Sequence, residues 1–181
     1  MFVMNKIYKD LLEQAKIDLP ANKKMLKHLK KKNIDTLFQK YHEKVFEKID
    51  CLDCANCCIT TGPMLVDRDI ARISKSLRIK PAVFEANYLR RDEDGDWVFK
   101  TMPCPFLGSD NYCLIYEVRP KACREYPHTD SKNMYKLFDI TLTNSTICPA
   151  VALILKEIRE INPIKIKNEK RLDGSRGDYS D

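Results

Sequence analysis

Apolar residues in the first fifty positions recur at the three- and four-residue spacing of amphipathic helices. They form two runs, Ile7, Leu11, Leu12 and Ala15, then Leu37, Tyr41, Val45 and Ile49. Pro20 and Asn33 interrupt the pattern. The pattern therefore predicts three helices within residues 1–50, separated at these two positions.

Two more helices are predicted in the middle of the chain. Asp67 is placed to cap the first of them, whose apolar positions are Ile70, Ile73 and Leu77. Pro81 suits the first turn of the second, since its fixed φ matches a helix start, and Val83, Phe84 and Tyr88 follow it.

The remaining pattern predicts a hairpin, an irregular region and a last helix. Asp94-Gly95 lies between Leu89 and the run 97–99, which is typical of a tight turn joining two strands. Residues 103–130 are punctuated by prolines, as expected of loops organised around a bound ion. Pro149 can open the last helix, which carries Val151, Ile154, Leu155 and Ile158 on one side.

These elements predict a mainly helical α+β fold with an irregular, metal-organised cysteine-rich centre and a small β-hairpin. We divide the chain into a helical N-terminal extension at 1–50, a cysteine-cluster metal-binding domain with a closing helix at 51–162, and a polar flexible tail at 163–181. The tail is polar and charged and contains Gly174 and Gly177, so it is expected to fray.

Composition is that of a globular protein: 181 residues, 44% hydrophobic and 32% charged, are enough for a buried core. The net charge of +6 is concentrated at the start, with +5 in residues 1–50 and zero in 51–148. No apolar run approaches the roughly 20 residues of a membrane helix, and the start does not read as a signal peptide. We therefore expect a cytoplasmic protein without a membrane association.

The strongest chemical signal is the spacing of the eight cysteines. They are Cys51, Cys54, Cys57, Cys58, Cys104, Cys113, Cys123 and Cys148. Two residues between successive thiols let a tight loop turn both sulfurs toward one ion. Cytosolic thiols stay reduced, so this spacing predicts metal ligation by all eight rather than disulfides.

The spacing favours iron without excluding zinc. Cys51-x-x-Cys54-x-x-Cys57, completed by a remote Cys-Pro, matches the bacterial ferredoxin pattern in outline. Cys104 and Cys148 both precede proline. Tetrahedral thiolate sites serve zinc equally well, so an iron–sulfur cluster or iron is the first prediction and zinc the alternative. Adjacent Cys57 and Cys58 cannot easily share one ion, and we expect them to have different partners.

Eight thiolates would leave a large negative surplus around divalent ions. Arg119 and Arg124 lie close to Cys123 in sequence, and we hypothesise that they help hold the cofactor by offsetting this charge. The competing interpretation is that both are surface arginines paired with Glu117 and Glu125.

The cysteine blocks resemble a known family. Cys51-x-x-Cys54-x-x-Cys57-Cys58, followed by Cys104-Pro105-Phe106-Leu107 and by Cys113-x-Ile115-Tyr116-Glu117-x-Arg119-Pro120-x-x-Cys123-Arg124-x-Tyr126-Pro127, is similar to the bacterial CxxCxxCC cysteine-cluster proteins, described as zinc- or iron-chelating domains. The same blocks resemble the cysteine-rich part of flagellin lysine N-methylases. The resemblance covers roughly residues 51–148 and implies metal chelation, with lysine methylation as a remote alternative.

Other functions receive less support. The five glycines form neither a dinucleotide-binding motif nor a phosphate loop, and clustered thiols argue against a lone catalytic cysteine. His128 is the one histidine near the cysteines, and we expect it to be exposed rather than a ligand. The aromatic residues around the cysteines are expected to shield a metal from water.

A second function, from a different class, is a structural-zinc adaptor. The lysines between 23 and 32 would then contact an unidentified protein partner, although a solvated helix face explains them more simply. Nucleic acid is not expected, because aromatic residues do not interleave with these lysines.

Overall fold

The computed structural model describes residues 6–29 and 33–163. Its elements, in chain order, are α1 (Lys6–His28), α2 (Ile34–Phe46), α3 (Asn56–Thr60), α4 (Asp67–Ser76), α5 (Pro81–Tyr88), β1 (Leu89–Arg91), β2 (Trp97–Phe99), η1 (Tyr116–Val118), α6 (Lys121–Glu125), η2 (Met134–Lys136), α7 (Phe138–Ser145) and α8 (Pro149–Ile161). The described chain is mainly helical with one two-stranded antiparallel sheet, as predicted. The predicted tail falls almost entirely outside the described residues.

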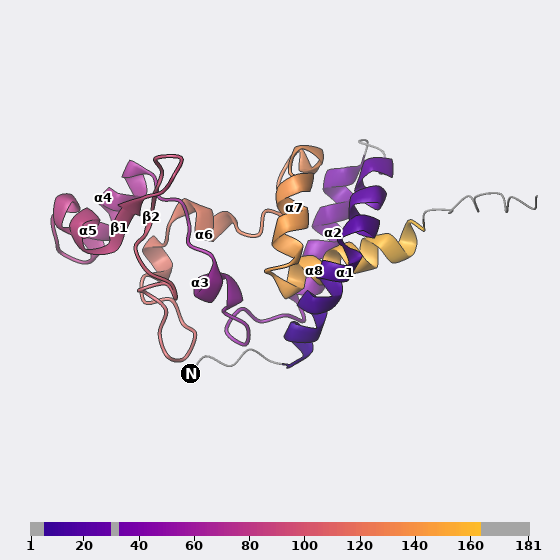
Figure 1. Cartoon of the computed structure of the whole chain (residues 1–181), viewed down its shortest axis with the longest axis horizontal. Coiled ribbons are helices and arrows are strands. Elements are labelled where there is room, and N and C mark those ends of the chain that lie inside the picture. The colour runs from indigo at the N-terminus through magenta and orange to yellow at the C-terminus, as the bar shows by residue number, and fades with distance from the viewer. Residues whose placement is uncertain (1–5, 30–32, 164–181) are drawn as a thin grey trace, which may run out of the picture.

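The first hydrophobic core lies within a bundle of α1, α2, α7 and α8 (Figure 1). The apolar face predicted for the last helix is confirmed, since Val151, Ile154, Leu155 and Ile158 are all fully buried. Phe38 and Val45 of α2 are fully buried in the same core. The N-terminal helices thus pack directly on the last helix, from the opposite end of the described chain.

The prediction of three helices before residue 50 is wrong, because α1 runs straight through Pro20. An interior proline costs about 3 kcal/mol. Buried residues on both sides of it offset that cost, Leu12 and Ala15 before and Met25 and Leu26 after. Asp18 and Asn22, which flank the proline, both accept hydrogen bonds from Arg159 of α8. The predicted break at Asn33 is confirmed, since this residue has a left-handed φ of 77° just before α2.

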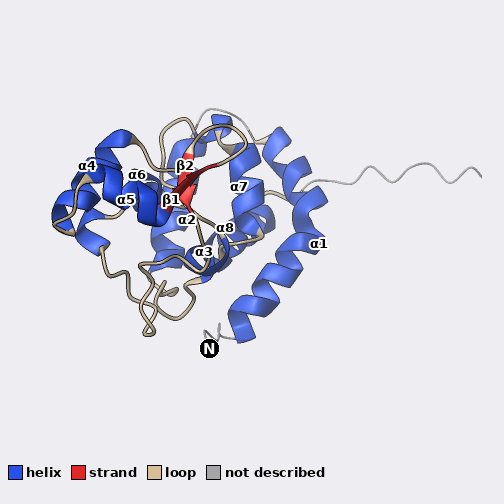
Figure 2. Ribbon diagram, turned by 60° about the vertical axis from the view of Figure 1, so that its left-hand side comes forward, coloured by secondary structure: helices blue, strands red, loops and turns tan. Residues whose placement is uncertain are grey.

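The second core is formed by α4, α5, the hairpin and the loop that follows it. The hairpin is confirmed, with Leu89 opposite Phe99, and it is drawn red in Figure 2. Gly95 has a φ of 83°, which only glycine adopts readily, and its N–H donates to the carbonyl of Asp92 at 3.2 Å. Phe84 is fully buried and lies near Phe106, with ring centroids 6.2 Å apart.

The predicted helix starts are correct at Pro81 and displaced at Asp67. Pro81 occupies the first turn of α5. Asp67 is itself the first residue of α4, and the side chain of Asp69 accepts the N–H of Val66, at the cap position, at 3.3 Å. Capping therefore comes from inside the first turn, where a carboxylate also interacts favourably with the helix dipole.

Helix α7 was not predicted. Its sequence, FDITLTNS, is rich in residues of low helix propensity and shows no apolar stripe. Tertiary packing stabilises it instead. Thr141, Asn144 and Ser145 are buried, and Asn144 Nδ2 donates to the carbonyl of Pro127 at 3.3 Å.

No single helix in the described part of the chain is long and apolar enough to cross a membrane. Helices α7 and α8 have the required length and composition only when taken together, and the chain bends by 115° between them.

Candidate metal centre

The eight cysteines come from three segments that lie around the junction of the two cores. These are the loop and helix at 51–58, the region 104–123, and Cys148 at the start of α8. Cys54 and Cys148 pack with the first core, whereas Cys104 and Cys113 pack with the second. Figure 1 shows α3 and α6 between the bundle and the α4–α5 region. None of the eight forms a disulfide.

The first segment is a tight turn followed by a short helix. The N–H groups of Cys54 and Ala55 both donate to the carbonyl of Cys51, at 3.1 and 2.8 Å. Ala55 has a φ of 47°, a left-handed conformation that a non-glycine residue rarely adopts. The chain therefore reverses between Cys54 and Cys57, which brings the turn and α3 together.

The second segment is tied to the first through the backbone. The N–H of Cys104 donates to the carbonyl of Cys58 at 2.8 Å, and Asn111 Nδ2 donates to the carbonyl of Leu52 at 2.5 Å. Within the segment, Leu107 and Cys113 form an isolated antiparallel bridge. These contacts bring Cys104 and Cys113 to the same loop end, beside Cys58.

Helix α6, which carries Cys123, is fixed to α4. Asp69 is only 1% exposed and accepts hydrogen bonds from Arg72 at 2.6 Å and from the N–H of Lys121 at 3.1 Å. Arg72 also donates to the carbonyl of Arg119 at 2.9 Å. Sequence reasoning missed this role of Asp69, because the first turn of α4 contains three charged residues and the sequence does not show which of them is buried.

Cys148 occupies the cap position of α8, directly before Pro149. Asn56 Nδ2 donates to the carbonyl of Ile147 at 2.7 Å, so the residues before Cys57 and before Cys148 are bonded to each other. Burial raises the pKa of Cys148 to about 12; the N–H groups of Val151 and Ala150 lower it, while Cys51 and Cys54 raise it further.

Backbone contacts and the two cores divide the cysteines into two sets. The first set is Cys51, Cys54, Cys57 and Cys148, and the second set is Cys58, Cys104, Cys113 and Cys123. Burial raises the pKa of Cys123 to about 12, and Cys58, Cys104 and Cys113 add to this increase. Burial likewise raises the pKa of Cys104 to about 11, with contributions from Cys58 and Cys113.

The two sets meet at Cys57 and Cys58. The Cys57 thiol donates a hydrogen bond to the Cys58 sulfur, which raises the pKa of Cys57 and lowers the pKa of Cys58 to about 7. Burial, Cys148 and Cys51 also raise the pKa of Cys57.

As they stand, the side chains do not surround a single point. Across residues 6–29 and 33–163, no group of three or more Cys, His, Asp or Glu side chains has an arrangement that could hold a metal ion. The thiols are close enough to change one another's pKa but must rotate to bind an ion together. His128, whose ring meets Tyr126 edge-on with centroids 6.4 Å apart, belongs to no such group either.

The low pKa of Cys58 leads to a pH-dependent prediction for metal-free protein. Below about pH 7 the Cys58 thiol is protonated, and above it the nucleophilic thiolate predominates. Alkylation of Cys58, followed by peptide mass spectrometry, should therefore rise through pH 7, before the other seven cysteines react. Cys57→Ala removes the donor and should move this rise to higher pH; an unchanged profile would refute the role of the Cys57 hydrogen bond.

Arg119 and Arg124 differ in their relation to the thiols. The pKa of Cys113 and of Cys123 is raised mainly by burial, and the charge of Arg119 opposes the increase at both. Arg124 instead donates to the carbonyl of Arg119 at 2.9 Å. Glu125, a predicted arginine partner, pairs with Lys121 at 3.6 Å.

Tyr126 carries a buried hydroxyl group with no hydrogen-bond partner in the described structure. Burial raises its pKa, and Cys148, Cys57, Cys54 and Cys51 raise it further. Sequence reasoning expected Tyr126 only as an aromatic shield, because nothing in the sequence shows which side of the ring is dry.

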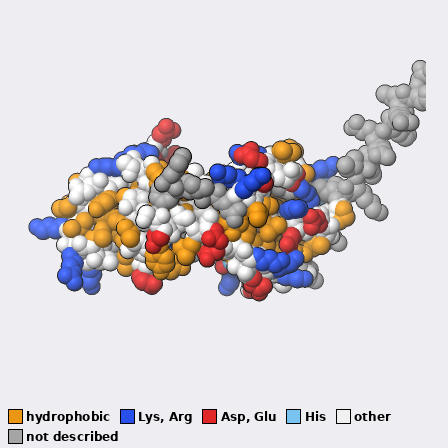
Figure 3. All heavy atoms as spheres, turned by 90° about the horizontal axis from the view of Figure 1, so that it is seen from below, with side chains coloured by type: hydrophobic (Ala, Val, Ile, Leu, Met, Phe, Trp, Pro, Cys, Tyr) orange, Lys and Arg blue, Asp and Glu red, His pale blue; other side chains and the backbone are white. Residues whose placement is uncertain are grey.

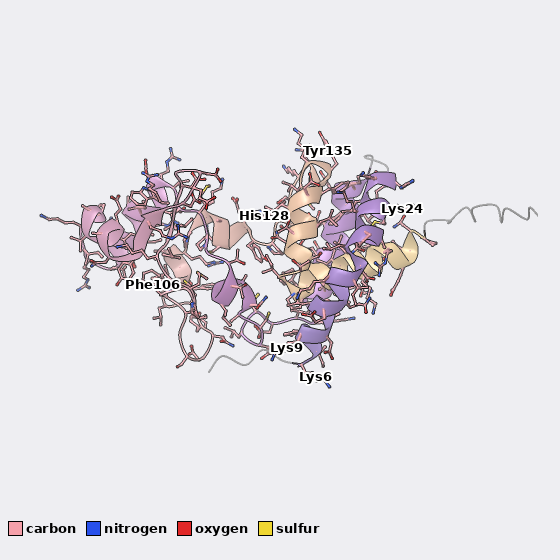
Figure 4. All side chains as sticks on the ribbon, viewed as in Figure 1. Lys6, Lys9, Lys24, Phe106, His128 and Tyr135 are labelled. Atoms are coloured by element: carbon pink, nitrogen blue, oxygen red, sulfur yellow. The ribbon has the colours of Figure 1, made fainter. Side chains whose placement is uncertain are left out.

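The lysines near the end of α1 lie on the bundle, away from the loop that carries Phe106. Lys23, Lys24 and Lys27 are exposed, and Figure 4 places Lys24 on the bundle, on the opposite side of the molecule from Phe106. Lys30, Lys31 and Lys32 are outside the described residues. On the face in Figure 3, Lys and Arg side chains are interspersed with Asp and Glu rather than gathered in one patch.

Comparison with known proteins gives one family. Searches of curated proteins and of solved structures each found no match. The resemblance to flagellin lysine N-methylases, and the methyl transfer it implies, stay expectations. A family model, whose description reads "Putative zinc- or iron-chelating domain", matches residues 50–148. This stretch contains all eight cysteines and ends on Cys148. The chain therefore belongs to the CxxCxxCC family, and this membership supports metal binding by its cysteines.

Proposed function

We propose that this protein binds iron, as an iron–sulfur cluster or as iron ions, through its cysteine thiolates. The observation that carries the proposal is that backbone contacts join the three segments that carry the cysteines, from Cys104 to Cys58 and from Asn56 to Ile147. The pKa values of the thiols are shifted by one another and by burial, which is expected of ligands in a partly dry site. When bound, such a centre would supply one-electron redox chemistry or sensing.

The identity of the metal is argued from the first set. Cys51, Cys54 and Cys57 have the two-residue spacing of a ferredoxin cluster, and Cys148-Pro149 supplies the remote Cys-Pro. The hydrogen bond from Asn56 to Ile147 holds this remote residue beside the others. The buried hydroxyl group of Tyr126 is a donor that thiolate or sulfide sulfur could use. The spacing and the remote Cys-Pro fit an iron–sulfur cluster. Zinc is supported only by the type of donor atom, since thiolate sulfur binds either metal.

The test is metal and sulfide analysis of protein purified without oxygen. We expect stoichiometric iron, acid-labile sulfide if the centre is a cluster, and visible absorption from sulfur-to-iron charge transfer. A colourless protein with stoichiometric zinc would overturn the iron proposal and keep thiolate chelation. Protein purified with neither metal would overturn both.

Arg119 should help retain the metal, because its charge favours the thiolates of Cys113 and Cys123. Replacing it with Gln is expected to weaken metal retention roughly two- to tenfold, the equivalent of up to about one pKa unit. Competition with a chromogenic chelator measures this. Arg124→Gln is the matched control, since Arg124 binds a carbonyl group; equal losses in both variants would contradict the assignment.

The alternative is a structural-zinc adaptor whose exposed lysines Lys23, Lys24 and Lys27 contact an acidic protein partner. Their separation from the loop that carries Phe106 favours independent roles for the two surfaces (Figure 4). Pull-down at increasing salt, repeated with the three lysines changed to Glu, tests this alternative. A partner retained through both treatments would exclude binding by these charges.

A further inference from the structure

We propose that the eight cysteines form two separate four-thiolate metal sites, one from the first set and one from the second. The proposal rests on the proposed metal-binding function and adds the number of sites and the ligands of each. The dividing line falls between two consecutive residues, Cys57 and Cys58.

The backbone supports this division. Cys51 and Cys54 share one turn, and the hydrogen bond from Asn56 to Ile147 places Cys57 and Cys148 on chain segments that are bonded together. Cys54 and Cys148 both pack with the first core. Cys54 and Cys148 are thus held on the bundle side of α3, and Cys51 and Cys57 are tied to them through the turn and through the bond to Ile147.

The second set is held on the other side. The N–H of Cys104 donates to the carbonyl of Cys58, and the bridge between Leu107 and Cys113 closes the loop that carries Cys104 and Cys113. Both of these cysteines pack with the second core. Helix α6 carries Cys123 and is joined to α4, also in this core, through Asp69.

Helix geometry separates the two adjacent cysteines. Cys57 and Cys58 both lie in α3, where consecutive side chains are about 100° apart around the axis. They can therefore face different cores. One shared eight-thiolate centre is the competing arrangement.

The test uses full-length, metal-free protein reloaded with zinc alone under anaerobic conditions. With one equivalent of zinc, the protein is alkylated, and molecules retaining one ion are selected by native mass spectrometry and fragmented. We expect each such molecule to protect four cysteines, all from one set, so that Cys57 and Cys58 are never protected together. At saturation, two ions and eight protected cysteines are expected. One-ion molecules with mixed protection, or with Cys57 and Cys58 both protected, would overturn the proposal.

Single variants give a second measurement. Cys148→Ser should leave one zinc ion bound and expose only Cys51, Cys54 and Cys57 to alkylation. Cys104→Ser should expose only the other three members of the second set. A shared centre would be established by two results together. Either variant would lose both ions, and wild-type molecules with one ion would protect cysteines from both sets. If the native protein contains iron but zinc-loaded molecules with one ion protect cysteines from both sets, the division into two sites is refuted and the proposed function stands.

A different observation, the orphaned hydroxyl group of Tyr126, carries a second inference. We infer that Tyr126 is a positioning residue whose hydroxyl group donates a hydrogen bond to a sulfur ligand of one of the two sites. A buried hydroxyl group without a partner is costly, and a metal-bound sulfur would supply the missing acceptor. The hydrogen bond would reduce the charge on the sulfur and stabilise the bound form.

Tyr126→Phe removes the hydroxyl group and keeps the ring. Zinc release from the doubly loaded protein to a chromogenic chelator should become several-fold faster for one of the two ions and stay unchanged for the other. Tyr112→Phe, at a 48% exposed position, is the control and should change neither. Unchanged release in Tyr126→Phe, or equal acceleration of both ions, would overturn the inference.

Discussion

Stripping the metal should lower the unfolding temperature by about 10 °C. At a free metal concentration a thousand times the dissociation constant, binding stabilises the native state by about 4 kcal/mol. For a chain of this length, each kcal/mol shifts the unfolding temperature by about 2–4 °C. The cysteine loops contain little regular structure of their own (Figure 2), so the ligand bonds would supply much of what orders them. Differential scanning calorimetry before and after anaerobic chelation measures the change.

Far-ultraviolet circular dichroism provides the control for this experiment. The first core packs through apolar side chains of four helices, so most of the helical signal should survive chelation at low temperature. Readdition of metal should restore the original transition. A transition that stays in place after complete removal of the metal would show that the ion has no folding role.

Phe84→Ala should lower the free energy of unfolding by about 3–5 kcal/mol, the usual effect of removing a buried aromatic ring. Phe84 is fully buried at the centre of the second core, with ring centroids 5.2 Å from Tyr88 and 6.2 Å from Phe106. This core is small, and Cys104 and Cys113 pack against it. The variant should therefore also bind metal more weakly. Urea titration of the metal-loaded protein and metal quantification measure both effects.

Val83→Ala is the matched control, because Val83 precedes Phe84 in α5 but is 43% exposed. It should change stability by less than about 1 kcal/mol and leave the metal content as it was. A Phe84→Ala protein as stable as this control would contradict the described second core. A destabilised Phe84→Ala variant with full metal content would show that metal binding does not depend on the packing of the second core.

The elements that sequence predicted correctly are those whose determinants are local. Pro81 and Pro149 open helices because a fixed φ and a missing N–H suit the first turn. Asp94-Gly95 forms the turn of the hairpin because Gly95 tolerates a positive φ. Pro20 misled the prediction because its cost is offset by contacts with α8, more than a hundred residues away. Helix α7 is stabilised in the same non-local way.

The candidate site shows the same limit. Cysteine spacing identified the possible ligands, and the adjacency of Cys57 and Cys58 already suggested separate partners. Spacing could not assign Cys104, Cys113, Cys123 or Cys148 to the set of Cys57 or to the set of Cys58. The assignment depends on how α6 and α8 pack. The different surroundings of Arg119 and Arg124 were equally hidden, since both lie close to Cys123 in sequence.

The placement of Cys148 at the start of α8 has a consequence for biosynthesis. Cys51, Cys54 and Cys57 leave the ribosome about ninety residues before Cys148, and α1 and α2 emerge before the helix on which they pack. Neither the bundle nor the first set of thiols can be completed while α8 is still in the exit tunnel. On the proposed division of the ligands, metal loading at this set would follow the synthesis of α8.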